Sequence, residues 1–186
     1  CMNVVPDNRS LCPYCQFEFA LYQGNENALA PGTILNQKYL VGRTLGIGGF
    51  GITYLAKDLY LQTKIAIKEF YPANLVNRNN HISKEITVHT HTSQGNHDFE
   101  MGMRRYIREA EILSHFFNLP GIVSVKDFFY ENETAYIVMD YVGERNVKQE
   151  IRENGAMDAK EVLMLMRPIL EALSKIHRTG MVHRDI

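Results

Sequence analysis

The stretch Leu45-Gly46-Ile47-Gly48-Gly49-Phe50-Gly51-Ile52-Thr53 decides how this sequence folds. Its glycines form the pattern G-x-G-x-x-G, in which backbone amides can approach phosphate oxygens closely because no Cβ stands in the way. Dinucleotide binding would require the loop to enter a helix after a single strand. Residues 52–55 instead continue as a β-rich run. The pattern therefore predicts a hairpin, which is either a plain turn or a loop that covers phosphates.

Strand-like runs lie on both sides of this glycine loop. Residues 39–45 precede it, residues 52–57 follow it, and Lys64-Ile65-Ala66-Ile67-Lys68 comes after turn-like residues 58–63. The three runs predict an antiparallel meander. Lys68 closes an apolar run, so it either extends its charge to the surface or is a cation that the fold holds for a purpose.

The rest of the chain shows helical spacing interrupted by two more strands. Apolar positions predict helices over 98–117, 146–152 and 159–177, with Asp98 as the N-cap of the first. Strands are predicted over 122–130 and 135–141. Pro168 lies inside the last helical pattern, where proline can kink a helix. Residues 72–97 are polar, with a possible strand over 82–88, and look like an insertion on the sheet rather than part of the core.

Composition excludes some classes of protein. The formal net charge is −1, which gives no general electrostatic reason to bind nucleic acid or an anionic membrane. No apolar run approaches the roughly 18 residues that span a bilayer, and no signal peptide is visible. The three cysteines all lie within the first 15 residues, which argues against a disulfide framework. We therefore expect a cytoplasmic, reducing setting.

The cysteines carry a separate prediction. Cys12-Pro13-Tyr14-Cys15 resembles one knuckle of a zinc ribbon, in which two thiolates take two corners of a tetrahedral site. Cys1 would be the last cysteine of a preceding knuckle, and three thiolates leave the site incomplete. A flexible tail with free thiols stays open as an alternative, whereas no βαβ pattern follows to favour a redox pair. We divide this end into a partial zinc-ribbon-like segment, 1–22, and a linker, 23–33.

The chain closes on His183-Arg184-Asp185-Ile186. Together with the glycine loop and Ala66-Ile67-Lys68, this motif resembles the signature set of the protein kinase family, and in detail the bacterial, eukaryotic-like serine/threonine type. The resemblance implies an α+β fold. A kinase-like N-lobe over 34–142, with a five-stranded antiparallel sheet, helix αC and the insertion 72–97, would lead into the hinge exit and first helices of a truncated C-lobe over 143–186.

The resemblance also implies catalytic roles. Asp185 would orient the substrate hydroxyl and accept its proton, and Arg184 would engage a phosphorylated activation loop. Lys68 would contact the α- and β-phosphates, as a buried ammonium behind the glycine loop. Glu109 would be the carboxylate that holds Lys68, with two other helix residues as competitors. These competitors are Glu100 and Glu111.

The implied nucleotide site covers the loop, two strands and the hinge. Phe50 would cap the phosphates, Ala66 would leave room for adenine, and Met139 would stand as gatekeeper, while backbone groups of Asp140 and Val142 would bond the adenine edge. The full implied set is Leu45, Gly46, Ile47, Gly48, Gly49, Phe50, Gly51, Thr53, Ala66, Lys68, Met139, Asp140 and Val142.

The expected activity is ATP-dependent phosphorylation of Ser and Thr hydroxyls on protein substrates. Its Mg²⁺ ligands in the family, an Asn and the Asp of Asp-Phe-Gly, follow the catalytic Asp and would lie beyond Ile186. Both ends of the chain look cut, so we expect a piece that does not transfer phosphate alone, from a parent protein whose membrane anchor, if any, lies elsewhere. The alternatives are a pseudokinase-like nucleotide-binding or scaffold module, and a phosphotransferase acting on small-molecule hydroxyls.

Overall fold

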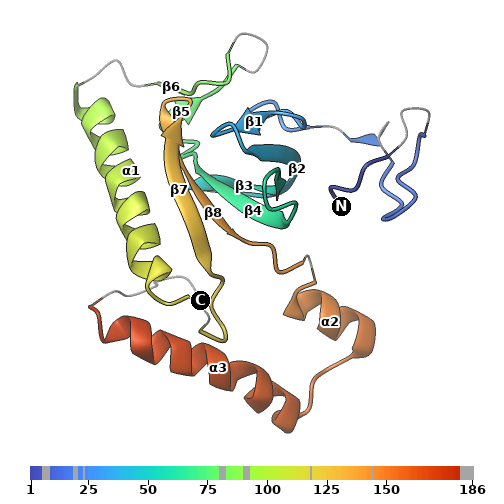
Figure 1. The fold of residues 1–186 in the computed structure, drawn as a ribbon. Coiled ribbons are helices and arrows are strands. Elements are labelled where there is room, and N and C mark those ends of the chain that lie inside the picture. Colours follow the sequence, from blue (N-terminus) through green and yellow to red (C-terminus); the bar gives the residue numbers. More distant parts are fainter. Residues whose placement is uncertain are drawn as a thin grey trace.

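The computed structural model describes residues 1–5, 9–18, 21–22, 24–79, 83–89, 93–117, 119–143 and 145–180. The predicted catalytic residues Arg184 and Asp185 lie outside the described residues. The strands are β1 Ile34–Leu35, β2 Tyr39–Gly48, β3 Gly51–Asp58, β4 Lys64–Phe70, β5 Val76–Asn77, β6 Thr87–Val88, β7 Val125–Glu131 and β8 Thr134–Asp140. The helices are α1 Ser93–Ser114, α2 Val147–Asn154 and α3 Ala159–His177 (Figure 1).

One curled antiparallel sheet organises the fold, with strand order β1-β2-β3-β4-β8-β7. The predicted α+β class and the β2-β3-β4 meander are confirmed. The sheet has six strands and not the predicted five. The additional strand is β1, which lies at the edge and has only two residues, too few to show a period in the sequence. The β7–β8 turn places Asn132 and Glu133 at φ 52° and 59°, the left-handed pair that a tight hairpin requires.

Helix α1 packs against the β7–β8 side of this sheet (Figure 1). Phe99 and Ile107 are the α1 side chains that join the buried core. The ring of Phe70, from β4, packs against the ring of Phe99 in a tilted arrangement, with 5.4 Å between the ring centroids. A Cβ on Gly102 would lie 2.9 Å from the tip of Phe70. An added Cβ at Gly102 would therefore require the Phe70 ring to shift.

The bounds of α1 differ from the predicted 98–117. The helix begins at Ser93 and ends at Ser114, so Asp98 is not its N-cap. The Asp98 carboxylate instead accepts a hydrogen bond from Gln94 Nε2 at 2.9 Å, an i,i+4 pair that stabilises the extra first turn. At the other end, the Ser114 hydroxyl donates to Glu111 O at 2.7 Å and helps to satisfy a terminal carbonyl.

The predicted insertion, 72–97, and the predicted linker, 23–33, both contribute side chains to the core. Val76 and Ile86, within the segment taken as a surface insertion, are buried in the main apolar cluster, and β5 pairs with β6. Ala28 and Leu29, within the expected linker, belong to the same cluster. The prediction that residues 72–97 are not part of the core is wrong, because Val76 and Ile86 help to fill the main apolar cluster.

Helix α3 begins at its predicted residue, whereas α2 spans Val147–Asn154 instead of the predicted 146–152. Asn146 caps α2 and Asp158 caps α3, and each makes a capping box with the residue three positions on. Helix α3 continues through Pro168 over its whole predicted length. Leu163, which is 70% exposed, lies on an apolar stripe of α3 that is largely uncovered. Among the described helices, none is long and apolar enough to cross a lipid bilayer.

Candidate functional site

The glycine loop is the tight β2–β3 hairpin, in which Gly48 pairs with Gly51. A Cβ on Gly51 would lie 2.5 Å from the carbonyl oxygen of Glu69 and 3.6 Å from Lys68 Cε. The hairpin base is thus clamped onto β4, where a side chain does not fit. At Gly49, by contrast, nothing lies within 4 Å of an added Cβ, so the tip is open.

Lys68 lies directly beneath this hairpin. It pairs in register with Thr53 on β3 and with Ile137 on β8. Its side chain is exposed, so the expectation of a buried ammonium is wrong. Lys68 Nζ stands 5.9 Å from the centroid of the Tyr106 ring, and Tyr106 Oη donates to the Lys68 carbonyl at 2.9 Å. Helix α1 therefore contacts both the backbone and the side chain of Lys68.

A cavity of about 380 Å³ opens on the α1 side of Lys68. Its polar side chains are Lys68, Tyr106 and Glu109, and its other lining side chains are apolar ones from α1, β8, α3 and the 121–125 segment. Burial, followed by the charges of Glu69 and Glu109, raises the pKa of Tyr106. Tyr106 consequently stays a neutral hydroxyl at this site.

Among the described residues, no carboxylate lies within ion-pair distance of Lys68. Glu109 is the α1 carboxylate that lines the same cavity. Of its two competitors, Glu100 pairs with Arg104 at 3.9 Å, and Glu111 does not line the cavity. The structure thus places Glu109 beside Lys68 without joining them, and the predicted pairing stays a prediction.

The expected adenine-facing residues meet at the β4–β8 pair. Ala66 is buried and lies opposite Met139, which also lines the cavity. The Asp140 backbone N–H donates to Ser124 O at 3.1 Å. This N–H is therefore already used within the protein, so the Asp140 carbonyl is the candidate group for contact with a ligand. Val142 is 75% exposed where the chain leaves β8.

The other side chains of the implied nucleotide site are either half-buried or exposed. Leu45 and Thr53 are half-buried where β2 and β3 pass over this region, and Ile47 and Phe50 are exposed. The Phe50 carbonyl accepts from Tyr71 N at 3.1 Å, which ties the tip of the hairpin to the end of β4.

A buried polar network next to Lys68 was missed by the sequence reasoning. Glu69 is fully buried on the opposite face of β4. Its carboxylate accepts hydrogen bonds from Tyr54 Oη and Tyr136 Oη, each at 2.7 Å, and from both terminal nitrogens of Arg78. Four donors compensate the cost of burying this charge. Glu69 follows Ile65 and Ile67 on one face of β4, and this polar residue on an otherwise apolar face was the available signal.

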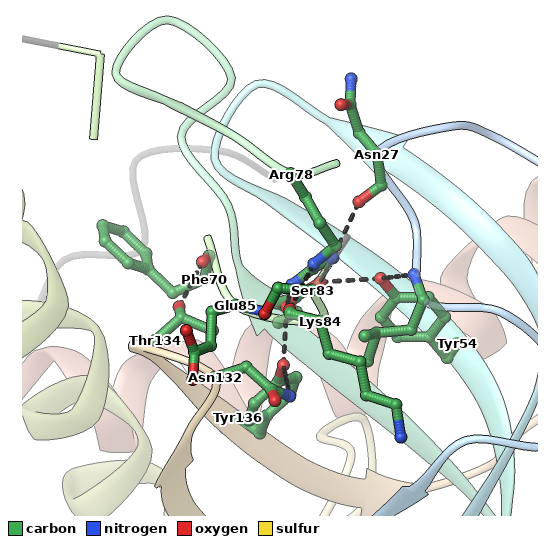
Figure 2. A network of polar contacts seen from close by, with 12 residues as sticks. Asn27, Tyr54, Phe70, Arg78, Ser83, Lys84, Glu85, Asn132, Thr134 and Tyr136 are labelled. Atoms are coloured by element: carbon green, nitrogen blue, oxygen red, sulfur yellow. Dashed lines mark hydrogen bonds and ion pairs between the residues drawn. The ribbon is translucent and has the colours of Figure 1, made fainter. Parts of the chain in front are cut away.

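Arg78 extends the same network to two other segments. Figure 2 shows its side chain reaching between Asn27, Tyr54 and Tyr136. Its Nε donates to Lys84 O at 2.7 Å, and Nη1 donates to Asn27 O at 2.8 Å. Burial by itself would lower the pKa of Arg78, but the hydrogen bonds and charge of Glu69 outweigh burial and raise it. The charged pair therefore connects the 24–33 segment and the β5–β6 hairpin to β4.

The predicted metal ligands also come together. The sulfur atoms of Cys1, Cys12 and Cys15 all lie within 4.8 Å of one another, and the 9–18 segment that holds two of them lies on the outer side of β2 (Figure 1).

Comparisons with known proteins place this geometry in a family. The family model described as protein kinase domain matches residues 93–186, half of the chain. Serine/threonine-protein kinase PrkC of Bacillus subtilis is 33% identical over 157 residues, which are 83% of this chain and 20% of that protein. The chain spans about a fifth of the length of PrkC and of two other bacterial relatives, and 40% of mouse Aurora kinase B.

Two solved structures are similar in fold and sequence. PpkA-294 in its apo form has a TM-score of 0.74 and 32% identity, over 86% of this chain and 55% of that chain. The kinase domain of Mycobacterium tuberculosis PknI has a TM-score of 0.61 and 27% identity, also over 86% and 55%. With the glycine hairpin over Lys68 and α1 alongside, these matches show that the chain belongs to the protein kinase family.

Proposed function

We propose that the protein containing this chain transfers the γ-phosphate of ATP to serine and threonine hydroxyls of protein substrates. The observation that carries the proposal is the contact between hairpin and lysine, with Lys68 Cε 3.6 Å from the Cβ position of Gly51. The relatives named as serine/threonine kinases support the substrate class. In this proposal residues 34–142 form the nucleotide-binding lobe, and the 143–186 segment begins the lobe that carries the substrate.

Protein kinases as a family use ATP and Mg²⁺, and the residues of the hairpin fit the phosphates of ATP. An added Cβ would find nothing within 4 Å at Gly46 or Gly49 and only one backbone atom, at 3.9 Å, at Gly48. Backbone amides there can approach phosphate oxygens, while Lys68 supplies a cation from below. Phe50, which is 76% exposed at the tip, would close over the bound phosphates.

The adenine ring would lie between the hairpin and the exit of β8. Ala66 leaves space on the β4 side, and Met139 borders that space beside it. Because the Asp140 N–H is already bonded to Ser124, its carbonyl is the group proposed to accept from the adenine amino group. The backbone N–H of Val142 would donate to a ring nitrogen.

Catalysis in this proposal is mostly positioning and charge neutralisation, because phosphoryl transfer leaves little covalent work to the protein. Lys68, held by Glu109, would fix the α- and β-phosphates. Asp185 would orient the substrate hydroxyl and take its proton, and Arg184 would respond to phosphorylation of an activation loop. The magnesium ligands of the family follow the catalytic Asp in sequence, so none of the residues described here is proposed to hold Mg²⁺.

The proposal is tested on the full-length gene product with labelled ATP, Mg²⁺ and a general protein substrate. Lys68→Met should reduce kcat/KM by at least about 100-fold, because the contact is made to groups that carry charge in the transition state. Lys64→Met is the matched control, since Lys64 lies on the same strand with its side chain exposed, and it should retain activity. Equal activity of both variants and the unchanged protein would refute the role of Lys68.

The same experiment separates the alternatives. A pseudokinase-like module would bind a fluorescent ATP analogue in a Lys68-dependent way and show no transfer. A small-molecule phosphotransferase would leave the protein substrate unlabelled while consuming ATP in the presence of a hydroxyl acceptor. Phosphoamino-acid analysis of a labelled substrate decides between Ser/Thr and Tyr, and phosphotyrosine alone would overturn the proposed specificity.

A further inference from the structure

The segment around Cys12 and Cys15 folds as a closed turn. The Cys12 N–H donates to Phe17 O at 2.8 Å, and the Gln16 N–H donates to Cys12 O at 2.9 Å. Gln16 has a φ of 57°, the left-handed conformation that lets the chain reverse directly after the second cysteine. These backbone bonds hold the two thiols of the Cys-x-x-Cys pair on one turn without help from a disulfide.

Cys1 completes a compact group of three thiols. Its sulfur lies 3.4 Å from that of Cys12, and all three sulfurs are within 4.8 Å of one another. A tetrahedral zinc ion with Zn–S bonds of about 2.3 Å places its sulfur ligands about 3.8 Å apart. Cys12 is only 2% exposed, and all three cysteines are free thiols. The spacing is that of a metal site rather than of three unrelated side chains.

We propose that Cys1, Cys12 and Cys15 bind one Zn²⁺ ion as thiolates, and that this ion fixes the shape of the N-terminal segment and so fastens the contacts that the segment makes with β2. Three thiolates in a tetrahedral arrangement select zinc among the common divalent ions, since calcium and magnesium take oxygen ligands. Among the described residues, no fourth His, Cys, Asp or Glu joins the group. Solvent or a ligand from outside these residues takes the fourth corner.

The place where the segment docks is defined by an irregularity in β2. The β2–β3 register shifts between Val41 and Thr44, a bulge that takes the Thr44 N–H out of the ladder. That N–H donates to Tyr22 Oη at 3.2 Å. The side chain of Met2 lies against Gly42 and leaves no room for a Cβ there. Both contacts come from the chain on either side of the cysteine turn.

A cavity of about 580 Å³ lies between the cysteine group and the sheet, lined by all three cysteines and by residues 40–43 of β2. The contact area is therefore loosely filled, and among the described residues of the 1–22 segment only Cys12 is a buried apolar side chain. A metal crosslink between residues 1 and 12 would supply the order that packing does not. The ordering effect of the metal would extend to β2, the strand that continues into the glycine hairpin.

The metal is tested on the purified chain expressed in zinc-replete medium, with metal content measured by mass spectrometry. We expect about one zinc per chain, and a cysteine-to-cobalt charge-transfer band after exchange with Co²⁺. Because the chain has three cysteines in all, this band can come only from this group. The double variant Cys12→Ser/Cys15→Ser should lose zinc and band together, while the control Ser10→Ala keeps both.

Three results would overturn the zinc site. The first is a zinc content equal to that of the double variant. The second is a cobalt complex without the charge-transfer band. The third is a disulfide between Cys1 and Cys12 in protein purified under reducing conditions. The fastening role has its own readout, hydrogen exchange at the Thr44 amide, which should accelerate several-fold when a chelator removes zinc. Exchange unchanged at Thr44 after complete zinc removal would refute the fastening while leaving the metal site standing.

Discussion

Arg78→Met should destabilise this fold more than any surface substitution of the same kind. The change keeps an unbranched apolar stem but removes the guanidinium from the buried pair. Four hydrogen bonds are lost, two to Glu69 and one each to Lys84 O and Asn27 O. Glu69 is then left buried with only the tyrosine hydroxyls as donors.

The magnitude follows from the burial of both partners, whose side chains are completely inaccessible to solvent. Removing one partner of such a pair typically costs about 3–5 kcal/mol, because the other charge stays buried without compensation. For a chain of this length, each kcal/mol lowers Tm by roughly 2–4 °C. We therefore expect the melting temperature to fall by about 10 °C, with raised exchange in β4 and in the β5–β6 hairpin.

The assay is urea and thermal unfolding followed by circular dichroism. Arg145→Met is the matched control, because Arg145 also pairs with a carboxylate, Glu150 at 2.7 Å, but is 63% exposed. It should change the free energy of unfolding by less than about 1 kcal/mol. Glu69→Gln/Arg78→Met should be more stable than Arg78→Met, since it buries no charge. A loss for Arg78→Met no larger than for the control would refute the reasoning.

Three further predictions use the same measurements. Gly51→Ala should lower the free energy of unfolding by about 1–3 kcal/mol, because its Cβ meets the β4 backbone at 2.5 Å. Gly49→Ala, with open space around its Cβ, is the control for stability, and equal losses would contradict the clamp. Burial, with the hydrogen bond to Asp127, raises the pKa of Tyr39 to about 12. The stabilisation that comes from the protonated Tyr39 hydroxyl is full below pH 10 and is lost as the pH rises to 12. Tyr39→Phe should therefore reduce the decrease in the free energy of unfolding between pH 10 and pH 12. A decrease equal to that of the unchanged protein would contradict this prediction. Asp158→Ala should lower unfolding free energy by about 1 kcal/mol through the lost cap, whereas Asp158→Asn should not.

The longer strands of the main sheet and the last helix could be predicted, because their residues repeat with a local period. Helix α3 has its predicted bounds, and β3 and β4 differ from theirs by at most two residues. The pairing of glycine hairpin and Lys68 was also accessible, because adjacent antiparallel strands bring Thr53 opposite Lys68 by register alone.

What could not be predicted depends on contacts between distant segments. Arg78 is nine residues from Glu69, and in the sequence it stands in a polar stretch that reads as surface. Leu29 is buried because its backbone N–H meets Tyr54 Oη at 3.0 Å, which is 25 residues away. The exposure of Lys68 likewise depends on what packs around its cavity. Local patterns carry no information on such pairings.

The base of the loop between β5 and β6 is closed by two bonds, Arg78 Nε to Lys84 O at 2.7 Å and Ser83 N to Asn79 O at 3.0 Å. Loop-closure entropy grows only slowly with length, so a loop whose base is fixed in this way can be lengthened at little thermodynamic expense. A peptide tag or a fluorescent-protein sensor inserted between residues 79 and 83 would leave both bonds in place, so engineers could use that position to attach a reporter.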